Sequence, residues 1–169
     1  MNIKLPPQDI EAERSVVGAL MLDKDAIIRV ADLISADDFY NPSHGKIYRA
    51  IFELFEKSEP VDILSVTKKL KDREQLTDIG GSTYLTDLIN SVPTATHISY
   101  YAKLVRQKKV LRDLISASSE INEKVFDSSE DSETLLDEIE QKIFAIGQKS
   151  RPQKFVHIKD ELKAAYERI

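Results

Sequence analysis

The sequence predicts an all-α protein. Almost every segment of the 169 residues carries apolar side chains at the three- and four-residue spacing of helices, and none shows the sustained alternation of a half-buried strand. Neither glycine nor proline occurs between Pro93 and Gly147, so nothing in that stretch interrupts a helix. We therefore expect a helical globule, then an antiparallel helical hairpin, then a C-terminal linker helix.

Residues 1–93 predict the globule. Pro6 and Pro7 precede a helix with Asp9 and Glu11 in its first turn, where the helix dipole favours negative charge. The apolar positions of this first helix are Ile10, Val16, Val17, Leu20 and Met21. A second helix is predicted over residues that recur at i, i+3, i+4 and i+7, namely Ile27, Val30, Ala31 and Ile34.

Three further helices should complete the globule. A break at 41–43 supplies an N-cap, and the helix after it is apolar over so much of its surface that it should be central to the core. Asp62 should cap the next helix. The turn at 79–82 combines two glycines with a further cap and leads into a helix that Pro93 ends.

Residues 94–148 predict the hairpin. Thr94 and Thr96 can cap a helix running to about Val125, roughly 45 Å long at 1.5 Å per residue. The acidic run 127–131 predicts a polar turn into a second helix. Both helices carry an apolar seam, formed by Leu104, Leu111, Leu114, Ile121 and Val125 in the first helix and by Leu136, Ile139, Ile143 and Ile146 in the second.

An apolar seam is usually internal core, but two helices alone form a thin layer that leaves part of each seam uncovered. Exposed apolar surface of that size predicts association. We therefore favour self-association of the hairpin over internal packing alone. The residues expected to take part are Leu111, Leu114, Ile139, Ile143 and Ile146.

Residues 149–157 are predicted to be a linker, because the chain from 148 to 154 contains no apolar residue. A final helix is expected at 158–169, with one apolar face formed by Ile158, Leu162, Ala165, Tyr166 and Ile169. Its periodicity persists to the last residue, which suggests that the natural protein continues.

The composition excludes several classes of function. There is no cysteine, so disulfides, thiolate chemistry and Cys-based zinc sites are ruled out. No apolar stretch approaches a membrane span, and the N-terminus lacks the apolar run of a signal peptide, so we expect a cytoplasmic protein. The net charge of −5 argues against strong DNA binding by this chain, although a local basic patch remains conceivable.

No catalytic or cofactor motif is present. The sequence has no phosphate-binding loop, no dinucleotide fingerprint and no metalloprotease motif, so we expect no cofactor and no metal here. Gly80-Gly81 is better explained as a turn than as an anion site, and Asp37-Asp38 as a cap of a short turn than as a carboxylate pair. The three histidines, His44, His97 and His157, lack metal-like partners and are expected at the surface or the core edge.

The long helix is locally basic, through Lys103, Arg106, Lys108, Lys109 and Arg112. The simplest interpretation is a solvated face beside the seam. A polar rim around a protein-docking site is the second interpretation, and DNA contact is the third.

Five segments resemble one known family. These are PPQDIEAERSVVGALMLD (6–23), DDFYNPSHGKIYRAIFEL (37–54), PVDILSVTKKL (60–70), LTDIGGSTYLTDLINSVPTATHISYYAKLVRQKKVLRDLI (76–115) and FVHIKDELKAAYERI (155–169). In this order they resemble the N-terminal (collar) domain and linker helix of the bacterial replicative DNA helicases of the DnaB family.

The resemblance implies an assembly and a motor. In that family the hairpins pair, and six N-terminal domains form a collar as a trimer of dimers. A linker helix docks on a neighbour's ATPase domain, here through Ile158, Leu162, Tyr166 and Ile169. The ATPase domain, which binds ATP and magnesium and drives 5′–3′ unwinding, would lie beyond this sequence. A helicase loader is a further implied partner.

The resemblance also implies a contact with primase, through its helicase-binding domain. The matching positions are Glu11, Tyr84, Arg112, Ile115 and Ile121. Alternatively, Ile115 and Ile121 are ordinary hairpin core and Tyr84 only caps the globule. Arg112 is expected to be exposed. Two other hypotheses remain: a helical dimerisation adaptor unrelated to replication, and an enzyme with an unrecognised site.

Overall fold

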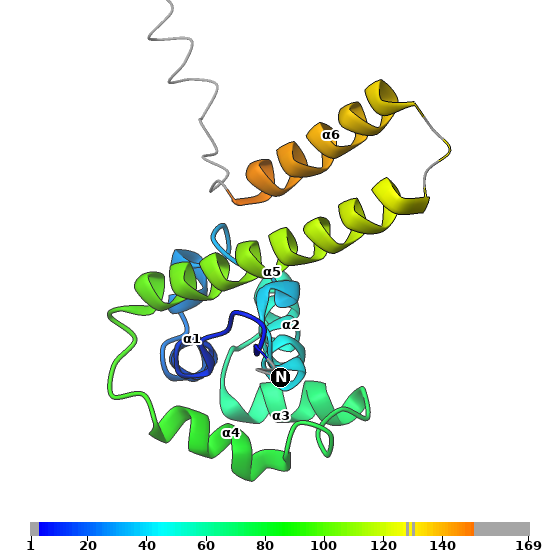
Figure 1. Ribbon diagram of the computed structural model, residues 1–169. Coiled ribbons are helices and arrows are strands. Elements are labelled where there is room, and N and C mark those ends of the chain that lie inside the picture. Colours follow the sequence, from blue (N-terminus) through cyan, green and yellow to red (C-terminus); the bar gives the residue numbers. More distant parts are fainter. Residues whose placement is uncertain (1–3, 128, 130, 151–169) are drawn as a thin grey trace, which may run out of the picture.

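The computed structural model describes residues 4–127, 129 and 131–150. Over that part of the chain all regular secondary structure is helical and there is no strand, which confirms the all-α prediction. The elements are α1 (Ile10–Leu22), η1 (Ala26–Arg29), η2 (Ala36–Asp38), α2 (Pro42–Glu56), α3 (Ile63–Asp72), α4 (Gly81–Asn90), α5 (Ile98–Asp127) and α6 (Ser132–Ser150), where η denotes a 3₁₀ helix. Helices α1 to α4 gather below α5, and α6 runs back along α5 (Figure 1).

Helix α1 is the centre of the globule. Asp9 is its N-cap and accepts a hydrogen bond from the backbone N–H of Ala12. Helix α1 packs against α2, α4 and α5, so almost its whole circumference is covered. Gly18 marks the crossing with α4, because a Cβ atom there would lie 2.4 Å from the carbonyl oxygen of Leu88. Only glycine allows the two helices to approach this closely.

The second predicted helix is wrong in type. Only Ala26–Arg29 is helical, as a short 3₁₀ helix, and a turn follows it. Val30 has φ −127° and ψ −10°, outside the α-helical region, so the chain bends there. Val30 is still fully buried because two successive turns bring it and its apolar neighbours to the core. The spacing correctly predicted burial, but tight turns satisfy it as well as an α-helix does.

Helix α2 lies within the core, as predicted. Asn41 caps it by accepting from Ser43 N–H, and Pro42 occupies its first turn, where no backbone donor is needed. Tyr48 is buried and donates its hydroxyl hydrogen to the carbonyl oxygen of Ile34 at 2.9 Å. Burial, assisted by the negative charge of Asp38, raises the pKa of the Tyr48 phenol far above its ordinary value.

Helices α3 and α4 close the globule. Asp62 caps α3 through Ser65 N–H, as the sequence predicted. Helix α4 is different, because its N-cap is Gly80, with φ 103° in the left-handed region. The expected cap at Ser82 is therefore wrong, since Ser82 lies inside the helix.

Helices α5 and α6 form the hairpin. The N-terminal half of α5 packs on α1, whereas its far half extends away from the globule and α6 runs back along it (Figure 1). Beyond Ala117 no side chain of the described hairpin is buried. The ion pairs Lys124–Glu138 and Lys142–Glu120 join the two helices.

Two details of the hairpin ends differ from the expected boundaries. Helix α5 begins at Ile98, after a turn in which Thr96 N–H donates to the Thr94 hydroxyl, and α6 reaches Ser150, past the expected end at 148. Asp131 caps α6 by accepting from Glu133 N–H and Thr134 N–H. The hydrogen bonds from Thr134, followed by that from Glu133, hold the pKa of the Asp131 carboxyl below its usual value.

Candidate protein-interaction surfaces

The described residues form no cluster of side chains that could hold a metal ion. No helix among them is long and apolar enough to cross a membrane. Every buried side-chain nitrogen or oxygen in that part of the chain has a hydrogen-bond partner. The buried polar groups of these residues therefore take part in holding the fold together.

A hydrogen-bonded network of Glu13, His44 and Tyr84 extends from the core to the surface of the globule. Glu13 and His44 are both essentially inaccessible to solvent. The Nδ1 atom of His44 lies 2.8 Å from Glu13 Oε2, and its Nε2 atom lies 2.7 Å from the Tyr84 hydroxyl. The prediction that His44 lies at the surface or core edge is wrong. Glu13, on another helix and 31 positions away in sequence, supplies a partner that no local spacing reveals.

Glu13 also organises the backbone before α2. Its Oε1 atom accepts from Tyr40 N–H at 2.6 Å, and Oε2 accepts from Asn41 N–H at 3.1 Å. A buried carboxylate is costly unless several donors compensate it, and here three groups do so. Glu13 was not singled out by the sequence, although a charged residue among the apolar positions of α1 was a signal that could have found it.

Arg112 is not exposed, which corrects the expectation for it. It is half-buried, and its guanidinium donates to the carbonyl oxygens of Pro7 at 2.7 Å and Asp38 at 2.6 Å. The same group lies over the Tyr40 ring, 5.5 Å from its centroid. Arg112 thus fastens the N-terminal segment and the segment before α2 onto α5. Changing it would disturb the fold as well as any surface.

Several of the basic side chains on α5 form ion pairs or hydrogen bonds within the protein. Arg106 lies 2.6 Å from the buried carboxylate of Asp38, and Lys109 pairs with Asp113. Asp38 also accepts from Ser35 N–H, which forms the capping box of η2. The predicted cap in the Asp37-Asp38 pair is confirmed, and Asp38 additionally joins the globule to α5.

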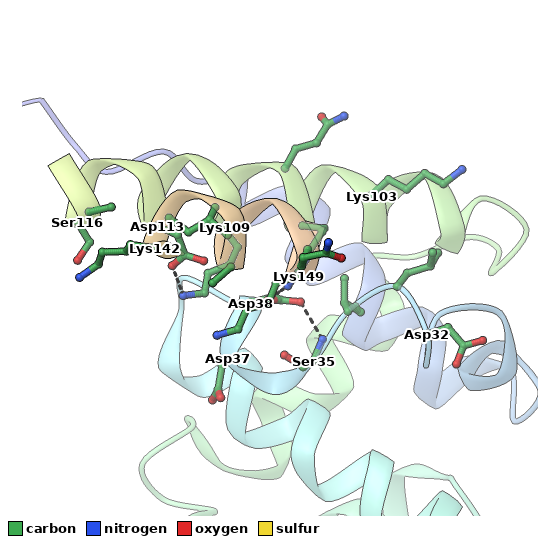
Figure 2. A pocket seen from close by; sticks show the side chains of 18 of the residues that line it. Asp32, Ser35, Asp37, Asp38, Lys103, Lys109, Asp113, Ser116, Lys142 and Lys149 are labelled. Atoms are coloured by element: carbon green, nitrogen blue, oxygen red, sulfur yellow. Dashed lines mark hydrogen bonds and ion pairs between the residues drawn. The ribbon is translucent and has the colours of Figure 1, made fainter. Parts of the chain in front are cut away.

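A cleft of about 890 Å³ opens between the residue 31–38 segment, α5 and the end of α6. Figure 2 shows its lining side chains, including Lys109 beside Asp113. Five acidic and five basic residues line it: Asp32, Asp37, Asp38, Asp113 and Glu120, and Lys103, Arg106, Lys109, Lys142 and Lys149. The two charges balance, so the cleft has no net preference for an anion or a cation.

The hairpin has an unusually apolar surface. Leu111, Leu114 and Ile143 are exposed, whereas Ile121, Ile139 and Ile146 are half-buried. The largest exposed apolar side chains are ones that the seam analysis missed: Phe126 is 83% exposed and Phe144 67%. Both lie beside predicted seam positions, so their size and neighbourhood were the available signal. Exposed apolar side chains thus occur on both α5 and α6, and exposed apolar surface of this kind is typical of interaction sites.

The residues expected to contact primase lie on three helices. Glu11 is exposed on α1, and Tyr84 is half-buried on α4. On α5, Ile115 is 53% exposed and Ile121 is half-buried, so Ile115 is not ordinary core in the single chain. The linker-helix positions Ile158, Leu162, Tyr166 and Ile169 lie outside the described residues, as does most of the predicted linker.

The described residues thus form a helical globule joined to a helical hairpin that carries exposed apolar side chains. Residues 5–107 match the family described as the DnaB-like helicase N terminal domain, and the chain belongs to that family. This confirms the resemblance.

Relatives and solved structures agree with the family match. The chain is 42% identical over its full length to the replicative DNA helicase DnaC of Bacillus subtilis, and 39% identical over 98% of its length to DnaB of Geobacillus stearothermophilus. It superposes with a TM-score of 0.79 on the crystal structure of the N-terminal domain of DnaB helicase from Mycobacterium tuberculosis. The superposition has 38% identity and covers 83% of this chain and 99% of that one. A second solved structure, of a DnaB-like replicative helicase and its interactions with primase, has the same fold. Its TM-score is 0.74 at 24% identity, over 95% of this chain and 36% of that one.

The chain spans 37% of the length of these two curated relatives. The matched residues correspond to the N-terminal domain of DnaB-like helicases. A dimerisation adaptor unrelated to replication is no longer an adequate description.

Proposed function

We propose that this chain is the oligomerisation and primase-docking domain of a hexameric, ATP-driven replicative DNA helicase. ATP and magnesium would be bound by a motor domain outside these residues, and the segment 158–169 would dock on a neighbouring subunit. The observation that carries the proposal is the uncovered apolar surface of the hairpin, formed by α5 and α6, in a chain of this family.

The exposed apolar side chains of the hairpin support self-association. Helix α6 buries none of the side chains that the structure describes, yet it carries Leu136, Ile143 and Phe144 in exposed positions. A second hairpin packed against the first would bury this surface. Burial of apolar surface would stabilise the dimer by about 25 cal/mol per Å². Pairing through hairpins would leave the globule free, which is consistent with a collar built from dimers.

Charge at Phe144 should break this association. We expect Phe144→Glu to raise the dimer dissociation constant about a hundredfold, because a carboxylate would have to be desolvated in an apolar interface. Light scattering across a concentration series should then show a lower mass at unchanged helix content. Gln141→Glu, which adds the same charge at another exposed position of α6, is the control. Equal masses for the Phe144 variant and the parent chain would rule out this face as the interface.

Primase docking is supported by the placement of the expected residues. Tyr84 presents an aromatic ring at the globule surface, and Ile115 presents apolar area on α5. Glu11 adds an exposed charge at the start of α1. An aromatic anchor with apolar area and a charged rim is typical of a modest protein interface. The DnaB-like replicative helicase whose interactions with primase have been described has the same fold.

Ile115 is the better probe of docking, because Arg112 holds the fold together. We expect Ile115→Ala to weaken binding of the cognate primase helicase-binding domain about fivefold in calorimetry, from lost apolar contact. The melting temperature and oligomer mass should stay close to those of the parent. Gln107→Ala, exposed on the same helix, is the control. Unchanged affinity in the Ile115 variant would remove α5 from the docking surface.

A further inference from the structure

We propose that His44, held by Glu13, is a positioning residue of the docking surface, and that its task is to fix the orientation of Tyr84. This inference rests on the proposed primase docking. Neither His44 nor Glu13 can itself touch a partner, because both side chains are buried. They act through Tyr84, which is the member of this hydrogen-bonded network that reaches the surface.

The geometry of the two rings supports this role. The His44 and Tyr84 ring planes are within 4° of parallel, and their centroids are 6.1 Å apart. Since the Tyr84 hydroxyl lies only 2.7 Å from His44 Nε2, the rings are joined end to end and do not lie face to face. The Tyr84 hydroxyl group is therefore hydrogen-bonded to a buried side chain of the globule. A partner would meet the ring of Tyr84, and its hydroxyl would be unavailable.

The remaining contacts of Tyr84 restrict it further. The guanidinium of Arg14 lies over the ring, 5.9 Å from its centroid. A Cβ atom on Gly80 would lie 3.1 Å from Cβ of Tyr84, so the left-handed turn before α4 runs close to the base of the side chain. With its hydroxyl end bound to His44, the ring is held at both ends. A pre-organised aromatic anchor loses less rotamer freedom on binding.

Glu13 keeps His44 in place from the other side. Its carboxylate is held by the N–H groups of Tyr40 and Asn41 and by His44 Nδ1. The imidazole is thus fixed at both ring nitrogens, and rotation of the ring would break both contacts. A carboxylate on one nitrogen orients the other toward its target, which is the arrangement used to orient histidines in functional sites.

Two isosteric variants separate the contacts. In His44→Asn the amide occupies the place of Nδ1, so the contact with Glu13 can persist while that with Tyr84 is lost. In His44→Gln the amide reaches the place of Nε2, so the contact with Tyr84 can persist. We expect His44→Asn to weaken binding of the cognate primase helicase-binding domain about tenfold, and His44→Gln to restore most of the affinity.

A double-mutant cycle with Tyr84→Phe tests the route of the effect. If His44 acts through the hydroxyl, His44→Asn should change affinity far less in the Tyr84→Phe background than in the parent chain. Additive effects of the two changes would overturn the inference. Val66→Ala, a core change on α3, is the control for general destabilisation and should leave affinity unchanged. Nuclear magnetic resonance gives a readout free of the partner: a slowly exchanging Tyr84 hydroxyl proton should disappear in His44→Asn and persist in His44→Gln.

The outcomes distinguish this inference from the proposed function. If Tyr84→Ala weakens primase binding but His44→Asn and His44→Gln both bind like the parent chain, docking stands and the positioning role is wrong. If the parent chain binds no primase domain, the proposed docking fails, and the inference fails with it. The hydroxyl resonance would then report only on the fold of the globule.

Discussion

Alanine at Gly18 should destabilise the protein by about 3 kcal/mol, because helix α1 crosses α4 too closely for a methyl group. The added Cβ atom would lie 2.4 Å from the Leu88 carbonyl oxygen and 2.7 Å from a methyl carbon of Val92. The side chain of Val92 could rotate, but the carbonyl belongs to the backbone of α4 and cannot move without shifting the helix. Thermal unfolding should show a melting temperature lower by roughly 10 °C.

Gly147 provides the matched control for Gly18. It lies in α6, and a Cβ atom there would meet nothing within 4 Å. Gly147→Ala should therefore leave stability unchanged or raise it by up to about 1 kcal/mol, because alanine favours a helix. Equal melting temperatures for Gly18→Ala and the parent chain would mean that α1 and α4 are farther apart in solution than in this structure.

Removing the Glu13 side chain should be more damaging still. In Glu13→Ala the backbone N–H groups of Tyr40 and Asn41 and the ring of His44 lose their acceptor inside the core, and a cavity remains. Breaking a buried charged network of this kind costs about 4 kcal/mol. Denaturant unfolding should show this as a lower midpoint, accompanied by loosening of the segment before α2.

Glu11 is the natural comparison, because it is the same residue type on the same helix but exposed. Glu11→Ala should change stability by no more than about 0.5 kcal/mol, since it removes only a favourable charge near the helix N-terminus. If Glu13→Ala unfolded at the same denaturant concentration as Glu11→Ala, the buried hydrogen bonds of Glu13 would contribute nothing to stability.

The helical elements were largely predictable because their signals are local. Asp62 caps α3 as predicted, and the apolar face of α2 required a surrounding core. Asp9, expected within the first turn, is instead the N-cap of α1. The failures were also local in origin. The spacing at Ile27 and Val30 fits both an α-helix and a pair of tight turns, and sequence spacing does not distinguish them.

The candidate surfaces were predicted unevenly. The apolar character of the hairpin was evident from its seams, but Phe126 and Phe144, its most exposed aromatic side chains, were not selected. Arg112 was expected to be exposed, yet it is half-buried and donates to two backbone carbonyls. Its partners, Pro7 and Asp38, are remote in sequence, so no pattern within α5 could indicate them.

The sequence by itself determined the helical class and membership of a helicase N-terminal domain family, since these depend on periodicity and on recognisable local motifs. Only the tertiary structure decided which polar residues are internal. Glu13, His44 and Tyr84 come from three different helices, and their contacts exist only once α1, α2 and α4 are packed. A buried charge is tolerated solely where distant donors converge on it, and that convergence is a property of three-dimensional packing.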